Sequence, residues 1–246
     1  MDRAIINNLF DLYAFLGSHS LISIDKAGPF HIINSERSVW PSMAYNPDED
    51  YSEFALDDLF NSLTHSSCKT VIVGGSFSKT LLPFFKMNRY MPVTQWYNMA
   101  KNLLSNEDIH LIEGLNITLC NTDQLLDDWT SVVSNVLFKN ETVDKNLFIN
   151  GVKKGVFKLI LGKMHDVAVS TVLVYCGETA GIYMVATLPE YQKKGIGKAM
   201  MGYAEQLVYE SGYPSALLHS TQSGLPLYKS LGYTLYDTNV LFYNFN

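Results

Sequence analysis

A short segment rich in glycine and lysine, residues 192–199 (Gln-Lys-Lys-Gly-Ile-Gly-Lys-Ala), has the composition of an anion-binding turn. It lies between a strand-like run at residues 181–187 and a helix-like run that begins near Gly197. The first N–H groups of a helix have no partner within the helix, and the helix dipole favours negative charge there. The glycines allow close approach of the backbone, and the three lysines add positive charge. The segment therefore predicts a site for a phosphorylated cofactor.

Each of these residues also has a simpler interpretation. The two glycines can serve only as turn and helix-cap residues, and the lysines can form an ordinary solvated face. The flanking strand and helix favour phosphate binding for the glycines, whereas for each lysine the two interpretations are balanced.

Two residues further along the chain have side chains that can move protons. His219 ends a short strand and is either a general base or, as is more common, a structural histidine. Tyr228 has a hydroxyl that either donates a proton or is a satisfied group within an aromatic core. Glu178 and His165 fall in turns, so we expect both to be exposed.

The elements that would position these residues can be predicted from residue 115 onward. A strand at 115–120 precedes a helix that is capped within 121–123 and runs to about Phe138. The remaining predicted elements are a short helix at 143–150, a strand hairpin at 156–161 and 167–176, a strand at 181–187, a helix from about 197 that Gly212 and Pro214 end, a strand at 216–219, a helix at 223–231, and one or two strands within 233–245.

This order of elements, β–α–α–β–β–β–α–β–α–β with the glycine turn after the fourth strand, resembles the GNAT superfamily of acyl-CoA-dependent N-acetyltransferases. Residues 192–197 match the acetyl-CoA signature of that family, (Arg/Gln)-x-x-Gly-x-(Gly/Ala), and residues 227–233 match its LYxxLGF segment. The resemblance covers roughly residues 116–246. Two motifs in the right order, with the right elements between them, are more specific than either motif alone.

The resemblance implies an α/β (α+β) fold with a central twisted sheet, mixed but mostly antiparallel, flanked by helices. It implies acetyl-CoA as the acyl donor and an amine, on a small molecule or a peptide, that attacks the thioester directly. Tyr228 is then the proton donor to the leaving thiolate. The implied cofactor-binding residues are Met184, Val185, Ala186, Gln192, Lys193, Lys194, Gly195, Ile196, Gly197, Lys198 and Thr221.

The sequence departs from the family pattern at three places. Gln192 stands where arginine is commoner, Thr221 stands where many relatives carry asparagine, and the strand at 181–187 has no carboxylate. The general base for the acceptor amine is then a water chain, His219 or no residue at all. No motif in the sequence identifies the acceptor. Three aromatic residues either line its site or pack in the core: Trp129, Tyr175 and Tyr243.

The first half of the chain has weaker patterns. A helix is predicted at 51–64 and a strand at 69–73, followed by a polar loop and a second helix. The loop does not fit the P-loop pattern GxxxxGK(S/T), because Val73 and Ser78 stand where glycines are required.

Residues 82–90 can be aligned with residues 225–233, which suggests that the first half is a degenerate GNAT-like copy. Phe85 then takes the place of Tyr228, and no glycine turn precedes it. Chance similarity is the alternative. We predict an N-terminal domain at 1–110 that walls the acceptor site and a catalytic domain at 114–246. The linker would lie within 105–114, after an amphipathic segment at 95–104.

Composition excludes several classes of protein. Of 246 residues, 47% are apolar and 17% are charged, so the chain can bury a large core and disorder is not expected. The formal charge of −6 argues against nucleic acid or an anionic membrane as the main partner. Residues 167–189 are long enough to span a membrane, but the interruption at 177–181 favours two strands.

The three cysteines, Cys68, Cys120 and Cys176, have no CxxC spacing, so we expect reduced thiols, no metal and a cytoplasmic location. The N-terminal residues lack the pattern of a targeting segment. A homodimer is left open. Two functional alternatives also stay open: a non-catalytic acyl-CoA-binding sensor, and an interaction protein whose glycine turn binds no cofactor.

Overall fold

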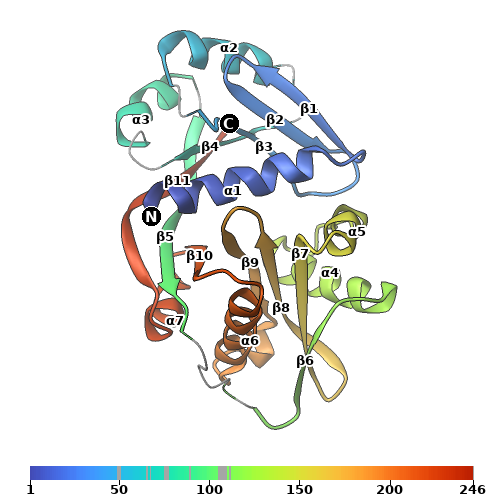
Figure 1. Cartoon of the computed structure of the whole chain (residues 1–246). Helices are drawn as coiled ribbons and strands as arrows, with labels where there is room; N and C mark the ends of the chain where they lie inside the picture. Colours follow the sequence, from blue (N-terminus) through green and yellow to red (C-terminus); the bar gives the residue numbers. More distant parts are fainter. Residues whose placement is uncertain are drawn as a thin grey trace.

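The computed structural model describes residues 1–48, 51–64, 66, 68–74, 78–88, 90–104, 110 and 112–245 (Figure 1). Two segments considered in the sequence lie partly outside these residues. They are the polar loop that was compared with a P-loop, of which residues 75–77 are not described, and the linker, of which residues 105–109 and 111 are not described.

The first half of the chain begins with a helix that the sequence patterns do not predict. Its elements are α1 (Asp2–Gly17), β1 (Ile22–Ala27), β2 (Phe30–Ser35), β3 (Ser42–Tyr45), α2 (Glu53–Thr64), β4 (Thr70–Gly74), α3 (Ser78–Met87) and the long strand β5 (Tyr90–Asn102). In α1 the buried residues Ile5, Leu9, Leu12 and Leu16 recur at helical spacing, so one face of this helix packs against the protein.

The second half follows the predicted order closely. Its elements are β6 (Leu115–Leu119), α4 (Asp123–Leu137), α5 (Asn146–Lys153), β7 (Phe157–Met164), β8 (Val167–Cys176), β9 (Ala180–Thr187), the 3₁₀ turn η2 (Pro189–Tyr191), α6 (Ile196–Glu210), β10 (Ser215–Ser220), α7 (Leu225–Ser230) and β11 (Thr234–Phe245). The predicted cap of α4 is confirmed, because the Thr122 side chain accepts a hydrogen bond from the Leu125 N–H. The predicted hairpin at 156–176 is also confirmed and turns at His165 and Asp166.

Within the described residues an 11-stranded sheet has the order β1-β2-β3-β4-β11-β5-β10-β9-β8-β7-β6. Neighbouring strands are antiparallel except for two parallel pairs, β3 with β4 and β9 with β10. The predicted mixed, mostly antiparallel sheet flanked by helices is therefore confirmed.

The two halves exchange one strand each. Strand β5 of the first half lies between β10 and β11 of the second half, and β11 lies between β4 and β5 (Figure 1). Each half has the same series: strands, a helix into a parallel strand (α2 into β4, α6 into β10), then a short helix into the exchanged strand (α3 into β5, α7 into β11). The predicted boundary near residues 110–114 stays a prediction, but the sheet is not divided there.

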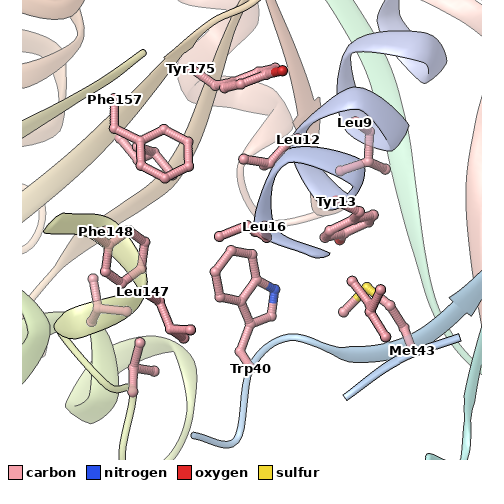
Figure 2. Close-up of a cluster of buried hydrophobic side chains, with 14 of the residues drawn as sticks. Leu9, Leu12, Tyr13, Leu16, Trp40, Met43, Leu147, Phe148, Phe157 and Tyr175 are labelled. Atoms are coloured by element: carbon pink, nitrogen blue, oxygen red, sulfur yellow. The ribbon is translucent and has the colours of Figure 1, made fainter. Parts of the chain in front are cut away.

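The helices cover both faces of this sheet. Helices α1, α4 and α5 contribute to one hydrophobic cluster, and on the opposite face α6 and α7 pack on the second half while α2 packs on the first. The first of these clusters joins the halves. Trp40, which precedes β3, stacks on Phe148 of α5 with ring centroids 6.0 Å apart, and Tyr13 of α1 lies beside it (Figure 2).

Three sequence interpretations are settled by this arrangement. The apolar run at 167–189 forms β8 and β9, as predicted, and no helix of the described part is long and apolar enough to cross a membrane. Most of the amphipathic segment at 95–104 belongs to a strand, β5. The segment at 233–245 is one strand, interrupted by a register shift between Leu235 and Asn239.

Candidate functional site

The parallel strands β9 and β10 separate at their carboxyl ends. Their pairing runs from Ala180 opposite Ala216 to Ile182 opposite Leu218 and is not continued beyond those residues. Just after this point Met184 has a positive φ of 48°, where the register between β8 and β9 shifts. A bulge of this kind bends a strand and changes the direction of its side chains. The result is a split in the middle of the sheet, with one open edge on β9.

Two hydroxyl groups of β8 form hydrogen bonds with backbone carbonyl groups of β9, and this shows which backbone groups of β9 have no partner on β8. Thr171 Oγ1 donates to the Met184 carbonyl at 3.0 Å, and Ser170 Oγ donates to the Ala186 carbonyl at 2.7 Å. Successive residues of a strand direct their N–H and C=O groups to opposite edges. Of the three predicted contacts on this strand, Val185 is therefore the one whose backbone faces the split.

The two hydroxyl residues that make these bonds were not predicted from the sequence. A signal was present, because Ser170 and Thr171 are adjacent polar residues in the middle of an otherwise apolar strand and both are fully buried. A buried hydroxyl needs a hydrogen-bond partner, so such a pair marks a strand edge with unusual bonding.

The glycine turn lies at the same end of the sheet as the split. Strand β9 ends at Thr187, η2 follows, and the Gln192 side chain donates to the Thr187 carbonyl at 2.9 Å. Lys193 and Gly195 both have positive φ values, 60° and 83°, and Gly195 is the N-cap of the 15-residue helix α6. The side-chain amide of Gln192 thus stabilises the turn, a structural role that the sequence did not indicate.

Gly195 and Gly197 differ in why glycine suits them. At Gly195 the left-handed φ disfavours any residue with a Cβ atom, and the Cβ of an alanine would stand 3.3 Å from His110 Nε2. At Gly197 a Cβ would make only an ordinary contact, 3.4 Å from Leu227 Cδ2. Protein packing therefore does not require glycine at residue 197, which fits a backbone kept clear for a ligand.

The turn is positively charged in an acidic chain. Lys193, Lys194 and Lys198 are exposed, and no ion pair joins them to a described carboxylate; Lys194 lies over the Tyr191 ring at 5.1 Å. The first amides of α6 have no acceptor within the helix. Backbone donors and cations that meet at a helix N-terminus can hold phosphate groups, so the residues present fit the phosphates of CoA.

Tyr228 of α7 borders the same hydrophobic cluster as the start of α6. Its ring is 8% exposed and packs edge-on against Tyr233 with centroids 5.8 Å apart. Its hydroxyl makes no hydrogen bond to a described residue. Burial of the side chain raises the pKa of Tyr228, so the group is neutral and can donate a proton.

Thr221, the last predicted cofactor contact, caps the start of α7. Its carbonyl accepts from the amides of Gly224 and Leu225 at 3.1 and 3.3 Å, and its hydroxyl lies 3.0 Å from Ser223 Oγ. The side chain is exposed, but its local bonds already explain why a hydroxyl residue suits this position. A contact of Thr221 with the cofactor stays a prediction.

His219 is partly buried on the α1 side of β10, and both of its ring nitrogens face oxygen atoms. Nδ1 lies 2.9 Å from Asn98 Oδ1 and Nε2 lies 3.2 Å from the Ile5 carbonyl. Burial lowers its pKa to about 4. A weak base whose nitrogens are occupied is poorly suited to take a proton from an ammonium group, so the structure favours the structural interpretation.

The aromatic residues considered for the acceptor site are core residues. Trp129 and Tyr243 have no exposed surface and Tyr175 is 6% exposed. The cysteine thiols are unpaired, and burial raises the pKa of Cys68 and Cys176 and that of Cys120 to about 12. Among the described residues no group of three or more His, Cys, Asp or Glu side chains is placed to hold a metal ion.

The equivalent region of the first half has different chemistry. The loop that joins β3 to α2 carries Asp48 and, in sequence, Glu49 and Asp50, where the second half has lysines. The Tyr51 hydroxyl accepts from the Gly74 amide at the end of β4, 3.3 Å away. Phe85, aligned with Tyr228, has no exposed surface and stacks on Tyr243 with centroids 4.3 Å apart.

The architecture is similar to that of several solved structures. A GCN5-related N-acetyltransferase from Kribbella flavida has 16% identity and a TM-score of 0.72, covering 99% of this chain and 95% of that one. Another from Sphaerobacter thermophilus has 13% identity and a TM-score of 0.62, covering 90% and 81%. A conserved protein of unknown function from Staphylococcus epidermidis has 13% identity and a TM-score of 0.59, covering 92% and 94%. At these identities the similarity concerns the fold.

The second half is then identified by its sequence. Residues 160–235 match the family model of the acetyltransferase (GNAT) domain, a segment that includes the split, the glycine turn and Tyr228. The match agrees with the GNAT resemblance that the two motifs indicated. No curated protein matches the chain in sequence.

Proposed function

We propose that the chain is an N-acetyltransferase that uses acetyl-CoA to acetylate an amine on a small molecule or a peptide. The observation that carries the proposal is that the open edge of β9 and the cationic glycine turn lie at the same end of the sheet. A long ligand with phosphates at one end and an amide-containing arm needs both: backbone donors at a helix N-terminus and a free strand edge.

The residues of this chain have separate tasks in that reaction. The amides from Lys194 to Gly197 and the neighbouring lysine side chains hold the phosphates, whereas the Lys198 amide already donates to the Gly195 carbonyl. The Val185 backbone bonds the arm. When bound, acetyl-CoA supplies an activated thioester carbonyl and a thiolate leaving group. Tyr228 holds the proton for that thiolate, because its hydroxyl is neutral and has no hydrogen-bond partner among the described residues. His219 fixes α1 against β10 and takes no proton from the amine.

Among the described residues, the features of the cofactor site lie in the second half. In the first half, carboxylates replace the lysines and Tyr51 bonds the end of β4, and both features disfavour a phosphorylated ligand. The matching series of elements supports the first half as a GNAT-like copy without catalysis, which walls the acceptor side through α1. The buried free thiols fit a reducing compartment, and we place the activity in the cytoplasm.

The test uses purified protein, acetyl-CoA and a panel of primary amines, with thiol release and product mass as readouts. Calorimetry measures the affinity for CoA. Tyr228→Phe should lower turnover by about 100-fold and leave both CoA affinity and thermal stability unchanged, because the hydroxyl makes no bond within the described protein. CoA binding without turnover of any amine would make the chain a sensor, and absence of CoA binding would refute the site.

A further inference from the structure

The glycine turn has a neighbour that lies outside the family motif. His110 belongs to the segment between β5 and β6, some 85 positions before the turn, yet its imidazole lies against Gly195. A Cβ atom at residue 195 would stand 3.3 Å from His110 Nε2 and 3.6 Å from His110 Cδ2. The nitrogen-bearing edge of the ring therefore faces the N-terminal cap of α6.

The position of this imidazole is fixed by residues that follow it. Ile112 packs against the hydrophobic cluster beneath α6, and its Cδ1 atom would lie 3.4 Å from a Cβ at residue 195. The Ile112 carbonyl accepts from the Leu115 amide at 3.1 Å, where β6 begins. Ile112 thus lies against the glycine turn through an apolar contact that does not use the imidazole.

The imidazole itself is exposed and makes no hydrogen bond or ion pair with a described residue. The turn that it faces carries the cations Lys193, Lys194 and Lys198. A phosphate held at this turn would accept a hydrogen bond from a ring N–H of a histidine in this place.

We infer that His110 is a ligand of the CoA phosphates, donating from its ring N–H to a phosphate oxygen held at the glycine turn. This inference rests on the proposed function, since it names a further binding residue for the same cofactor. It adds a contact from His110, a residue that lies outside the family motif. Two phosphate groups can take this contact: the pyrophosphate and the 3′-phosphate.

Calorimetry with the full chain tests the assignment. His110→Ala should weaken CoA binding by roughly 10-fold, the size of one hydrogen bond to a charged group. His110→Gln, which keeps an N–H donor, should recover part of that loss. His165→Asn, at an exposed histidine in the β7–β8 turn with φ 49°, is the matched control, because asparagine tolerates this left-handed conformation, and it should bind CoA as the wild type does. Thermal unfolding should be unchanged in all three variants.

A second ligand separates the two phosphates. If His110→Ala weakens 3′-dephospho-CoA as much as CoA, the contact is with the pyrophosphate, and if dephospho-CoA is unaffected, the contact is with the 3′-phosphate. Either result supports the assignment. Wild-type affinity of His110→Ala for both ligands, or tighter binding, overturns it while the proposed function stands. Failure of the wild-type protein to bind CoA overturns both.

Discussion

The substitution Gly195→Ala separates backbone strain from ligand binding at the proposed phosphate site. Gly195 has φ +83° at the N-cap of α6, and a side chain in this left-handed region costs about 1–2 kcal/mol. For a chain of this size each kcal/mol lowers Tm by roughly 2–4 °C, so we expect a loss of about 2–8 °C. The added methyl group also lies 3.3 Å from His110 Nε2, closer than most such contacts.

The effect on CoA binding should be larger than the effect on folding. The new Cβ lies beside the amides that face the phosphates, and losing one hydrogen bond to a charged group costs about 1.5–3 kcal/mol. Affinity for CoA should therefore fall by roughly 10- to 150-fold, measured by calorimetry at a temperature where the variant is folded.

The same helix provides the control. Gly212 follows the C-terminus of α6 with φ +86°, and a Cβ there meets nothing within 4 Å. Gly212→Ala carries the same backbone strain far from the turn, so it should lose a similar amount of stability and keep its affinity for CoA. The reasoning is refuted if both variants lose affinity equally, or if Gly195→Ala binds CoA as the wild type does.

Two further predictions concern buried polar groups. Burial lowers the pKa of His219 to about 4, so the unfolded chain binds more protons than the folded one between about pH 6.5 and 4, and stability falls as the pH drops through that range. His219→Gln should remove up to about 3 kcal/mol of this loss, measured by urea unfolding at pH 7 and pH 4.5. Equal pH dependence of the two proteins would contradict this prediction. Lys101 of β5 pairs with Glu205 of α6 at 2.7 Å, and both side chains are less than a tenth exposed, so Lys101→Met should lower the free energy of unfolding by about 3–5 kcal/mol. The double variant Lys101→Met with Glu205→Leu should recover most of this loss. Equal stability of the single and double variants would show that the protein tolerates the buried Glu205 carboxylate without Lys101.

Most of the second half was predictable because its signals are local. A hydroxyl before an apolar periodic run marks the start of α4, and glycines with polar neighbours mark the turns. The glycine turn and the Tyr228 segment were found for the same reason, since each is a continuous stretch whose residues act through their own backbone or neighbours.

Much of the first half could not be predicted from local sequence signals. Helix α1 and strands β1 to β3 were not predicted, although α1 has a regular apolar face. The placement of β5 between β10 and β11 could not follow from sequence spacing, because strand order depends on pairings between residues more than a hundred positions apart. The contact of His110 with Gly195 depends on the same kind of long-range packing.

The sequence by itself determined the chemistry: a cationic glycine turn before a helix, a tyrosine in a family motif, and no carboxylate on the preceding strand. Only the tertiary structure decided the geometry in which that chemistry is used. It opened the split between β9 and β10, left the Val185 edge free, and brought His110 to the turn. Motif residues interact with residues close to them in sequence, so they can be recognised from the sequence. An open strand edge depends on how all the neighbouring strands pair, so only the tertiary structure shows it.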